Sequence, residues 1–169
     1  MTAKNISQAD ESAGAPLCRE PNSLQRILVV EDDAAIRRVN TEILTYSGYQ
    51  VDAAEDGAAA WDALQLNKYD LVVTDNDMPK VTGVELIQKL RAARMTLPVI
   101  MATGAPPEEV FTRYGMPPPA RTLLKPYTLK ELVSAVEEVL QAASDSLGEI
   151  APAAPWLVQP PADGFRLCP

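Results

Sequence analysis

The sequence predicts an α/β fold, a doubly wound five-stranded parallel sheet in the strand order 2-1-3-4-5 with helices on both faces. Short apolar runs alternate five times with stretches of helical periodicity, and this alternation is typical of parallel sheets with crossover helices. Apart from the second, the runs are largely apolar, as strands buried on both faces are. Right-handed crossovers leave few topologies. The second run is the most polar, which favours an edge position and hence this order.

Each predicted strand is a short apolar run that ends at polar or turn residues. Leu71 to Val73, for example, form a run long enough for a buried strand and too short for a helix, and the strand ends at Asp75. The predicted strands are 26–30, 50–54, 71–75, 97–102 and 122–124.

Apolar residues recur at helical spacing between these strands, and capping residues mark several helix ends. Thr82 and Glu85 form a capping box, as do Thr128 and Glu131, and Gly48 suits the position just after a helix. The apolar positions of the five predicted helices are Ile36, Val39, Ile43 and Tyr46; Ala60, Trp61 and Leu64; Leu86, Ile87 and Leu90; Val110, Phe111 and Tyr114; and Leu129, Leu132, Val133, Val136, Val139 and Leu140.

Length and composition predict one domain with a loosely structured segment at each end. Residues 1–25 are polar and rich in small side chains, which predicts a disordered N-terminal arm. Residues 26–143 hold all the predicted strands and helices and form a domain of common size. Residues 144–169 are rich in Pro and Ala and show no periodicity, which predicts a tail.

Composition excludes several classes of function. The net charge of −8 argues against nucleic acid as a direct ligand, because phosphate binding needs basic patches. The chain has no histidine, which removes histidine bases and histidine metal ligands. Cys18 and Cys168 lie in the terminal segments and suggest neither a disulfide framework nor a zinc site. There is no secretory signal and no apolar run near the roughly 18 residues of a membrane span, so we expect a cytoplasmic protein without membrane contact.

The carboxyl ends of parallel strands meet at one edge of the sheet, where such folds place their chemistry. In the predicted order, four strand ends deliver Glu31, Asp32, Asp75, Thr103 and Lys125 to this edge. Two unit charges ~4 Å apart repel by roughly 4 kcal/mol at an effective dielectric of ~20, so the three carboxylates need a cation. With no His or Cys available, the ligands are oxygens, which suits Mg²⁺ or Mn²⁺.

The same side chains supply the parts that phosphoryl transfer requires. Asp75 ends the middle strand and is best placed as the nucleophile, which would give an acyl phosphate. Lys125 offers a fixed positive charge to an incoming anion, and Thr103 offers a hydroxyl donor. These residue types at these strand ends therefore point to a metal-assisted phosphoacceptor site.

Four motifs in order resemble the receiver domain of two-component response regulators. They are I-L-V-V-E-D-D, D-N-D-M-P with Gly83 after it, M-A-T-G and L-K-P-Y, and the resemblance covers about residues 26 to 142. It implies a flavodoxin-like fold and a phosphoryl group taken from a phosphohistidine on a sensor histidine kinase or a histidine phosphotransfer protein. It also implies slow hydrolysis of the phosphoryl group afterwards.

The resemblance further assigns roles to the site residues. Asp75 would be the phosphoacceptor and a metal ligand. Asp32 would bind Mg²⁺ directly, and Glu31 directly or through water. The backbone carbonyl of Asp77 would be a further ligand.

The resemblance also implies that Thr103 moves toward the phosphoryl group and that Lys125 pairs with that group. Two positions depart from the family pattern. The family usually carries Tyr or Phe three residues before the lysine, and its ring rotates as the threonine moves; here Thr122 occupies that switch position. Tyr127 is interpreted as packing. A triple proline within residues 116–119 replaces a small-residue loop, which predicts an unusual output surface.

We therefore expect a stand-alone receiver, not an enzyme, whose chemistry is limited to self-phosphorylation and self-dephosphorylation. Its output would be a protein contact with an unknown target or onward phosphotransfer, because the tail lacks a helix-turn-helix or a basic cluster for DNA. Two alternatives stay open. One is a phosphorylation-independent adaptor, which Thr122 favours. The other is an aspartate-nucleophile phosphatase, which the D-x-D of Asp75 and Asp77 suggests although such a nucleophile usually ends the first strand.

Overall fold

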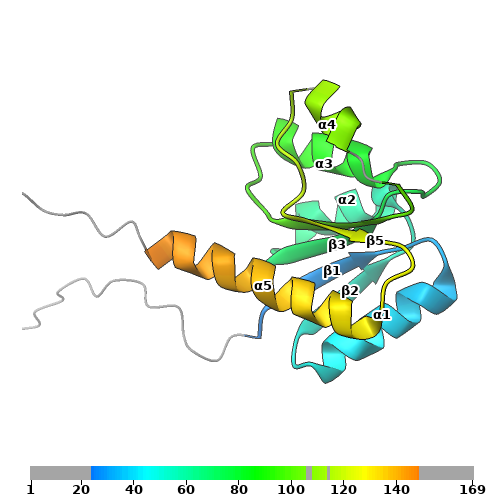
Figure 1. The fold of residues 1–169 in the computed structure, drawn as a ribbon, viewed down its shortest axis with the longest axis vertical. Coiled ribbons are helices and arrows are strands. Elements are labelled where there is room, and N and C mark those ends of the chain that lie inside the picture. The colour runs from blue at the N-terminus through cyan, green and yellow to red at the C-terminus, as the bar shows by residue number, and fades with distance from the viewer. Residues whose placement is uncertain (1–23, 106–107, 114, 149–169) are drawn as a thin grey trace, which may run out of the picture.

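The five predicted strands form one sheet between two layers of helices (Figure 1). This computed structural model describes residues 24–105, 108–113 and 115–148. Most of the predicted arm, the predicted tail beyond Gly148, and Cys18, Tyr114 and Cys168 lie outside the described residues. The elements are β1 Arg26–Val30, α1 Ala34–Tyr46, β2 Gln50–Ala54, α2 Gly57–Leu66, β3 Leu71–Asp75, α3 Gly83–Ala92, β4 Val99–Thr103, α4 Glu108–Arg113, β5 Arg121–Leu124 and α5 Leu129–Gly148.

The strand order is β2-β1-β3-β4-β5, and all four neighbouring pairs are parallel, so the predicted topology is confirmed. Every residue of β3 and of β4 is buried, which agrees with their apolar sequences and central positions. β2, the most polar run, lies at one edge, and β5 lies at the other.

Alternate strand residues point to opposite faces, so the sheet separates two hydrophobic cores. On one face Leu28 and Val72 pack with Leu86 of α3 and with residues of α2 and α4. On the other face Ile27 and its neighbours pack with α1 residues and with Val136 of α5. Figure 1 shows the same division, with α1 and α5 on one side of the sheet and α2, α3 and α4 on the other.

Side-chain caps fix where helices begin at the carboxyl edge of the sheet. Asp33 and Asp56 each accept hydrogen bonds from two backbone N–H groups in the first turn of α1 and α2. Both predicted capping boxes, at Thr82 and Thr128, are present. These bonds satisfy N–H groups that a helix start leaves without partners, and they hold the loops that carry the strand-end residues.

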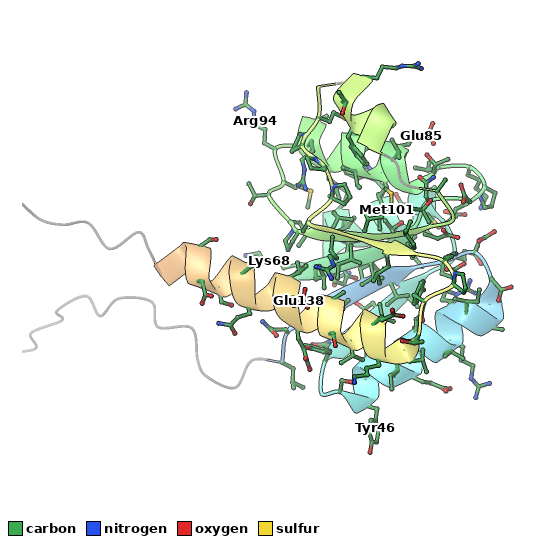
Figure 2. All side chains as sticks on the ribbon, viewed as in Figure 1. Tyr46, Lys68, Glu85, Arg94, Met101 and Glu138 are labelled. Atoms are coloured by element: carbon green, nitrogen blue, oxygen red, sulfur yellow. The ribbon has the colours of Figure 1, made fainter. Side chains whose placement is uncertain are left out.

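Of the apolar stripe that predicts α1, only Ile43 packs against the core. Ile36, Val39 and Tyr46 are 40%, 43% and 87% exposed, and Tyr46 projects away from the sheet in Figure 2. The buried residues of α1 are instead Asn40 and Leu44. Helical spacing therefore identifies the helix correctly, but it does not identify which side meets the sheet.

α5 continues to Gly148, so its last five residues lie in the segment that the sequence assigns to the tail from 144 onward. The hydroxyls of Ser144 and Ser146 each donate to the carbonyl four residues earlier, and Gln141 donates to Asp145. Polar residues satisfied in this way continue a helix after its apolar stripe has ended. Although α5 has 20 residues, no helix in the described part of the chain is long and apolar enough to cross a membrane.

Candidate functional site

The backbone register sets the strand ends side by side at the carboxyl edge. Asp75 at the end of β3 lies opposite Ala102 of β4, and Thr103 lies opposite Leu124 of β5. The N–H of Lys125 then donates to the carbonyl oxygen of Thr103 at 2.9 Å. Residues that are far apart in the sequence therefore meet at one edge of the sheet.

Glu31, Asp32 and Asp75 come together as three carboxylates. Each offers one oxygen, and these oxygens lie within 4.8 Å of one another. Glu31 and Asp75 are 2% and 5% exposed, whereas Asp32 is exposed. Carboxylates at this separation repel one another, and a divalent cation with oxygen ligands offsets the repulsion. The donor set therefore fits Mg²⁺ or Mn²⁺.

Lys125 places a positive charge against this cluster. Its ammonium lies 2.8 Å from Oδ2 of Asp75 and 3.4 Å from Oε2 of Glu31. Burial lowers the pKa of Lys125, but the hydrogen bond to Asp75 and the charges of Asp75 and Glu31 outweigh burial, so the pKa is raised overall. Lys125 is therefore protonated at neutral pH.

Glu31 lies in surroundings that disfavour its charge. Burial raises the pKa of the Glu31 carboxyl, and the negative charge of Asp75 raises it further, while Lys125 and the N–H of Asp33 act in the opposite direction. The net result is a raised pKa. A bound cation would favour the charged form of this side chain, which again fits a metal at this position.

The β3–α3 loop brings Asp77 next to the cluster. The N–H of Asp77 donates to Oδ1 of Asp75 at 3.3 Å, so both carboxylate oxygens of Asp75 have hydrogen-bond partners. At the far end of the loop, Gly83 packs so closely on Asp75 that a Cβ would clash with the Asp75 carbonyl oxygen. The loop is thus held near the phosphoacceptor candidate. The role of the Asp77 carbonyl as a metal ligand stays a prediction.

Thr103 lies at the end of β4 and Thr122 within β5, and neither side chain bonds to the carboxylate cluster in this arrangement. Thr103 is 1% exposed, and its hydroxyl donates to the carbonyl of Ala105 at 2.9 Å and accepts from the Ala105 N–H at 3.3 Å. Thr122 is half-buried in β5 and lies opposite Met101 in the register. The predicted switching roles of the two threonines are therefore not visible as contacts with Asp75.

Two contacts at the site have no signal in the sequence. Arg37 of α1 donates to the carbonyl oxygens of Glu31 and Asp32 at 2.7 and 3.1 Å and so supports the loop that carries them. The side chain of Asn40, which is 3% exposed, donates to the hydroxyl of Tyr127 at 3.1 Å. Beyond its packing role, Tyr127 therefore joins the β5–α5 loop to α1 through this hydrogen bond. The Arg37 contacts lie within six residues but follow no capping or spacing rule, whereas the Asn40–Tyr127 bond joins residues 87 positions apart and exists only in the folded chain.

A groove of about 620 Å³ runs beside Lys125, between α1 and the start of α5. Its lining is mostly apolar and comprises Ala35, Ile36, Val39, Asn40, Lys125, Pro126, Tyr127 and Leu129. Ile36 and Val39 of α1 thus line a groove that also includes Lys125, whose ammonium contacts Asp75 and Glu31.

Comparison with known proteins agrees with the geometry. The sequence matches the response regulator receiver domain family over residues 27–137. Response regulator MprA of Mycobacterium sp. (strain KMS) is 36% identical over 134 residues, which cover 78% of this chain and 57% of MprA. The receiver protein CpdR of Brucella abortus (strain 2308) is 33% identical over 120 residues, which cover 71% of this chain and 100% of CpdR. The chain thus spans little more than half the length of MprA.

Solved structures share the fold. A CheY-like receiver domain protein from Methanospirillum hungatei JF-1 matches with a TM-score of 0.67 and 28% identity over 73% of this chain and 99% of that chain. Response regulator TrrA from Thermotoga maritima, solved in complex with Mg(2+)-BeF, matches with a TM-score of 0.61 and 28% identity over 69% of this chain and 99% of that chain. Sequence match, strand order and the clustered carboxylates agree, and the chain belongs to the receiver domain family of two-component response regulators.

Proposed function

We propose that this receiver accepts a phosphoryl group on Asp75 from a phosphohistidine of a sensor histidine kinase or a histidine phosphotransfer protein. Mg²⁺ or Mn²⁺ would be held by Asp75, Glu31, Asp32 and the carbonyl of Asp77. One observation carries the proposal: the buried Asp75 carboxylate lies within 4.8 Å of two other carboxylates and accepts a hydrogen bond from Lys125. Slow self-dephosphorylation would end the signal, and output would be a protein contact or onward phosphotransfer.

In the proposed reaction a carboxylate oxygen of Asp75 attacks phosphorus. The P–N bond to the donor imidazole breaks, its electron pair stays on the nitrogen, and an aspartyl phosphate forms. The bound cation would neutralise charge on the phosphoryl oxygens. Lys125 is already beside Asp75, so its ammonium needs only a small movement to pair with a phosphoryl oxygen. Thr103 can donate to the same group only after its hydroxyl leaves Ala105.

The groove between α1 and α5 supports a protein as the phosphodonor. A small phosphodonor needs no apolar contact surface, yet Ile36, Val39 and Leu129 are each at least 40% exposed and line the same groove as Lys125. Exposed apolar residues gathered next to a charged site are a usual feature of protein interfaces. A partner that carries its phosphohistidine on an apolar helix would cover this groove and bring the donor nitrogen to Asp75.

The proposal is tested by intact-mass spectrometry after incubation with Mg²⁺ and acetyl phosphate. The wild-type chain should gain one acid-stable, base-labile phosphoryl group, and Asp75→Asn should gain none. Asp62→Asn, which changes an exposed aspartate of α2, is the matched control and should be labelled like wild type. Equal labelling of the Asp75→Asn and wild-type chains would reject Asp75 as the acceptor.

A phosphorylation-independent adaptor is the second candidate, and two observations favour it. Thr122 replaces the usual switch aromatic, and the Thr103 hydroxyl is already bonded within its own loop. Amide hydrogen exchange distinguishes the two. A switching receiver should change its exchange rates around Thr103 and Thr122 on phosphorylation, whereas an adaptor should be labelled on Asp75 with unchanged exchange there.

A further inference from the structure

The loop that carries Asp77 contains a strained turn. The N–H of Val81 donates to the carbonyl oxygen of Pro79 at 2.8 Å, and the residue between them, Lys80, has φ of 65°. A three-residue γ-turn with positive φ at its centre is rare and strained. Such a conformation in a residue other than glycine persists only where the surroundings enforce it. Two contacts with α2 hold Lys80 in this conformation.

The first of these contacts is an ion pair with α2. Nζ of Lys80 lies 2.5 Å from Oδ2 of Asp56. The Asp56 side chain is only 3% exposed, and its other oxygen caps α2 by accepting from Ala58 and Ala59 at 2.9 and 2.8 Å. The hydrogen bond between the two side chains lowers the pKa of Asp56 and raises the pKa of Lys80, so both are charged at neutral pH. An ordinary surface ion pair contributes little, but here one partner is a buried carboxylate that the lysine neutralises.

The second contact is steric and comes from the neighbouring residue. A Cβ at Gly57 would lie 2.5 Å from the carbonyl oxygen of Val81, so the turn lies directly on the first residue of α2. At the amino side of the turn Met78 is buried, 5% exposed. The turn is thus fixed to α2, and Asp77 lies in the short span between Asp75 and this fixed point.

We propose that Lys80 is a positioning residue: its ion pair with Asp56 holds the strained turn against α2 and so sets the place of the Asp77 backbone carbonyl at the metal site. This inference rests on the proposed function, in which that carbonyl is a ligand of Mg²⁺. Asp77 is three residues from Lys80, and its N–H already bonds to Asp75. If the turn relaxed, the peptide plane that carries the Asp77 carbonyl would rotate with it.

The proposal and simple electrostatics predict opposite signs. Lys80→Met removes a positive charge from the loop that carries Asp77, and this alone would strengthen Mg²⁺ binding. If Lys80 positions Asp77, the same change should weaken Mg²⁺ binding. Substitution of a residue that orients a metal ligand typically lowers metal affinity by about tenfold or more. The direction of the change therefore decides between the two.

The experiment is calorimetric titration of the full chain with Mg²⁺. We expect Lys80→Met to raise the Kd by about tenfold, Lys80→Arg to stay near wild type because it can keep the ion pair, and Asp56→Asn to resemble Lys80→Met while still capping α2. Lys130→Met is the control for charge alone, since Lys130 is an exposed lysine in the first turn of α5, and its Kd should be unchanged or lower. Amide exchange over residues 77–82 should accelerate in Lys80→Met and not in Lys130→Met.

The outcomes separate this proposal from the proposed function. If the wild-type chain takes up no Mg²⁺ or is labelled without Asp75, the proposed function fails. If the wild-type chain binds Mg²⁺ and is labelled on Asp75, but Lys80→Met binds Mg²⁺ as well as wild type or more tightly, only the positioning role is overturned. At saturating Mg²⁺, Lys80→Met should regain the wild-type rate of labelling by acetyl phosphate, and a rate that stays low would also overturn it.

Discussion

The ammonium of Lys125 lies 2.8 Å from Oδ2 of Asp75, although the two residues are 50 positions apart in the chain. The same ammonium lies 3.4 Å from Glu31. Lys125 therefore already neutralises part of the negative charge that a metal ion would neutralise. Lysine and metal must share the same two carboxylates, and this sharing gives the first prediction.

Lys125→Met should bind Mg²⁺ more tightly than wild type, with a Kd lower by about fivefold, because a competing charge worth about 1 kcal/mol is removed. Calorimetric titration measures the change, with Lys130→Met as the control. The variant should still be labelled on Asp75, but phosphorylation should no longer alter amide exchange around Thr103. A Kd equal to or higher than that of wild type would show that Lys125 does not compete with the ion.

Mg²⁺ affinity should fall in mild acid because of Glu31. Its raised pKa means that a proton competes with the metal at pH values above the ordinary glutamate pKa of 4.5. The Kd for Mg²⁺ should therefore rise as the pH is lowered from neutral toward the ordinary glutamate pKa of 4.5, and Glu31→Gln should flatten that dependence. Without metal the sign for stability follows from the same shift: the contribution of Glu31 is present at low pH and is lost as the pH rises through its folded pKa. A Kd independent of pH over this range would contradict the assignment.

Gly83→Ala should destabilise the fold and abolish labelling of Asp75. A Cβ at this position would clash with the carbonyl oxygen of Asp75, and forcing extra volume into a packed site costs about 1–3 kcal/mol. Chemical denaturation measures the loss of unfolding free energy. Gly104→Ala is the matched control, because a Cβ at Gly104 has nothing within 4 Å. Equal stability of the two variants would mean that the β3–α3 loop can shift freely.

Tyr127→Phe should lower the free energy of unfolding by about 1–2 kcal/mol, because the buried Asn40 amide loses its partner. The hydroxyl of Tyr127 accepts from Asn40 at 3.1 Å, and no ring contact changes. Urea denaturation is the measurement. Tyr46→Phe, at a tyrosine that is 87% exposed, should have no effect. If the two variants lose equal stability, the hydrogen bond to Asn40 contributes nothing.

The sheet and its strand order could be predicted because buried parallel strands appear in the sequence as short apolar runs. β3 and β4 begin with continuous apolar runs, and the polar residues of β2 indicate its edge position. Once the order is known, the carboxyl ends follow, so the meeting of Glu31, Asp32, Asp75 and Lys125 could be predicted without any structure. This part of the site depends on topology alone.

Other features could not be predicted, and the reasons are physical. The stripe on α1 has helical spacing, but an apolar stripe that lines a groove looks in sequence like one that meets a core. The end of α5 could not be predicted because its last residues are polar, and its serine hydroxyls donate to backbone carbonyls of the helix itself. The Lys80–Asp56 pair joins residues 24 apart through a strained turn, and no local rule relates them.

The two cores give the site a further property. Along β3, Asp75 continues the alternation of Leu71 and Val73, which belong to the α1–α5 layer, and Lys125 follows Leu123 of that same layer. Thr103 continues the alternation of Val99 and Met101, which belong to the opposite layer. A hydroxyl that reached from Thr103 to a group on Asp75 would bridge across the rim of the sheet. Phosphorylation of Asp75, on the α1–α5 side of the sheet, would thereby affect the helices on the opposite side through the side chain of Thr103.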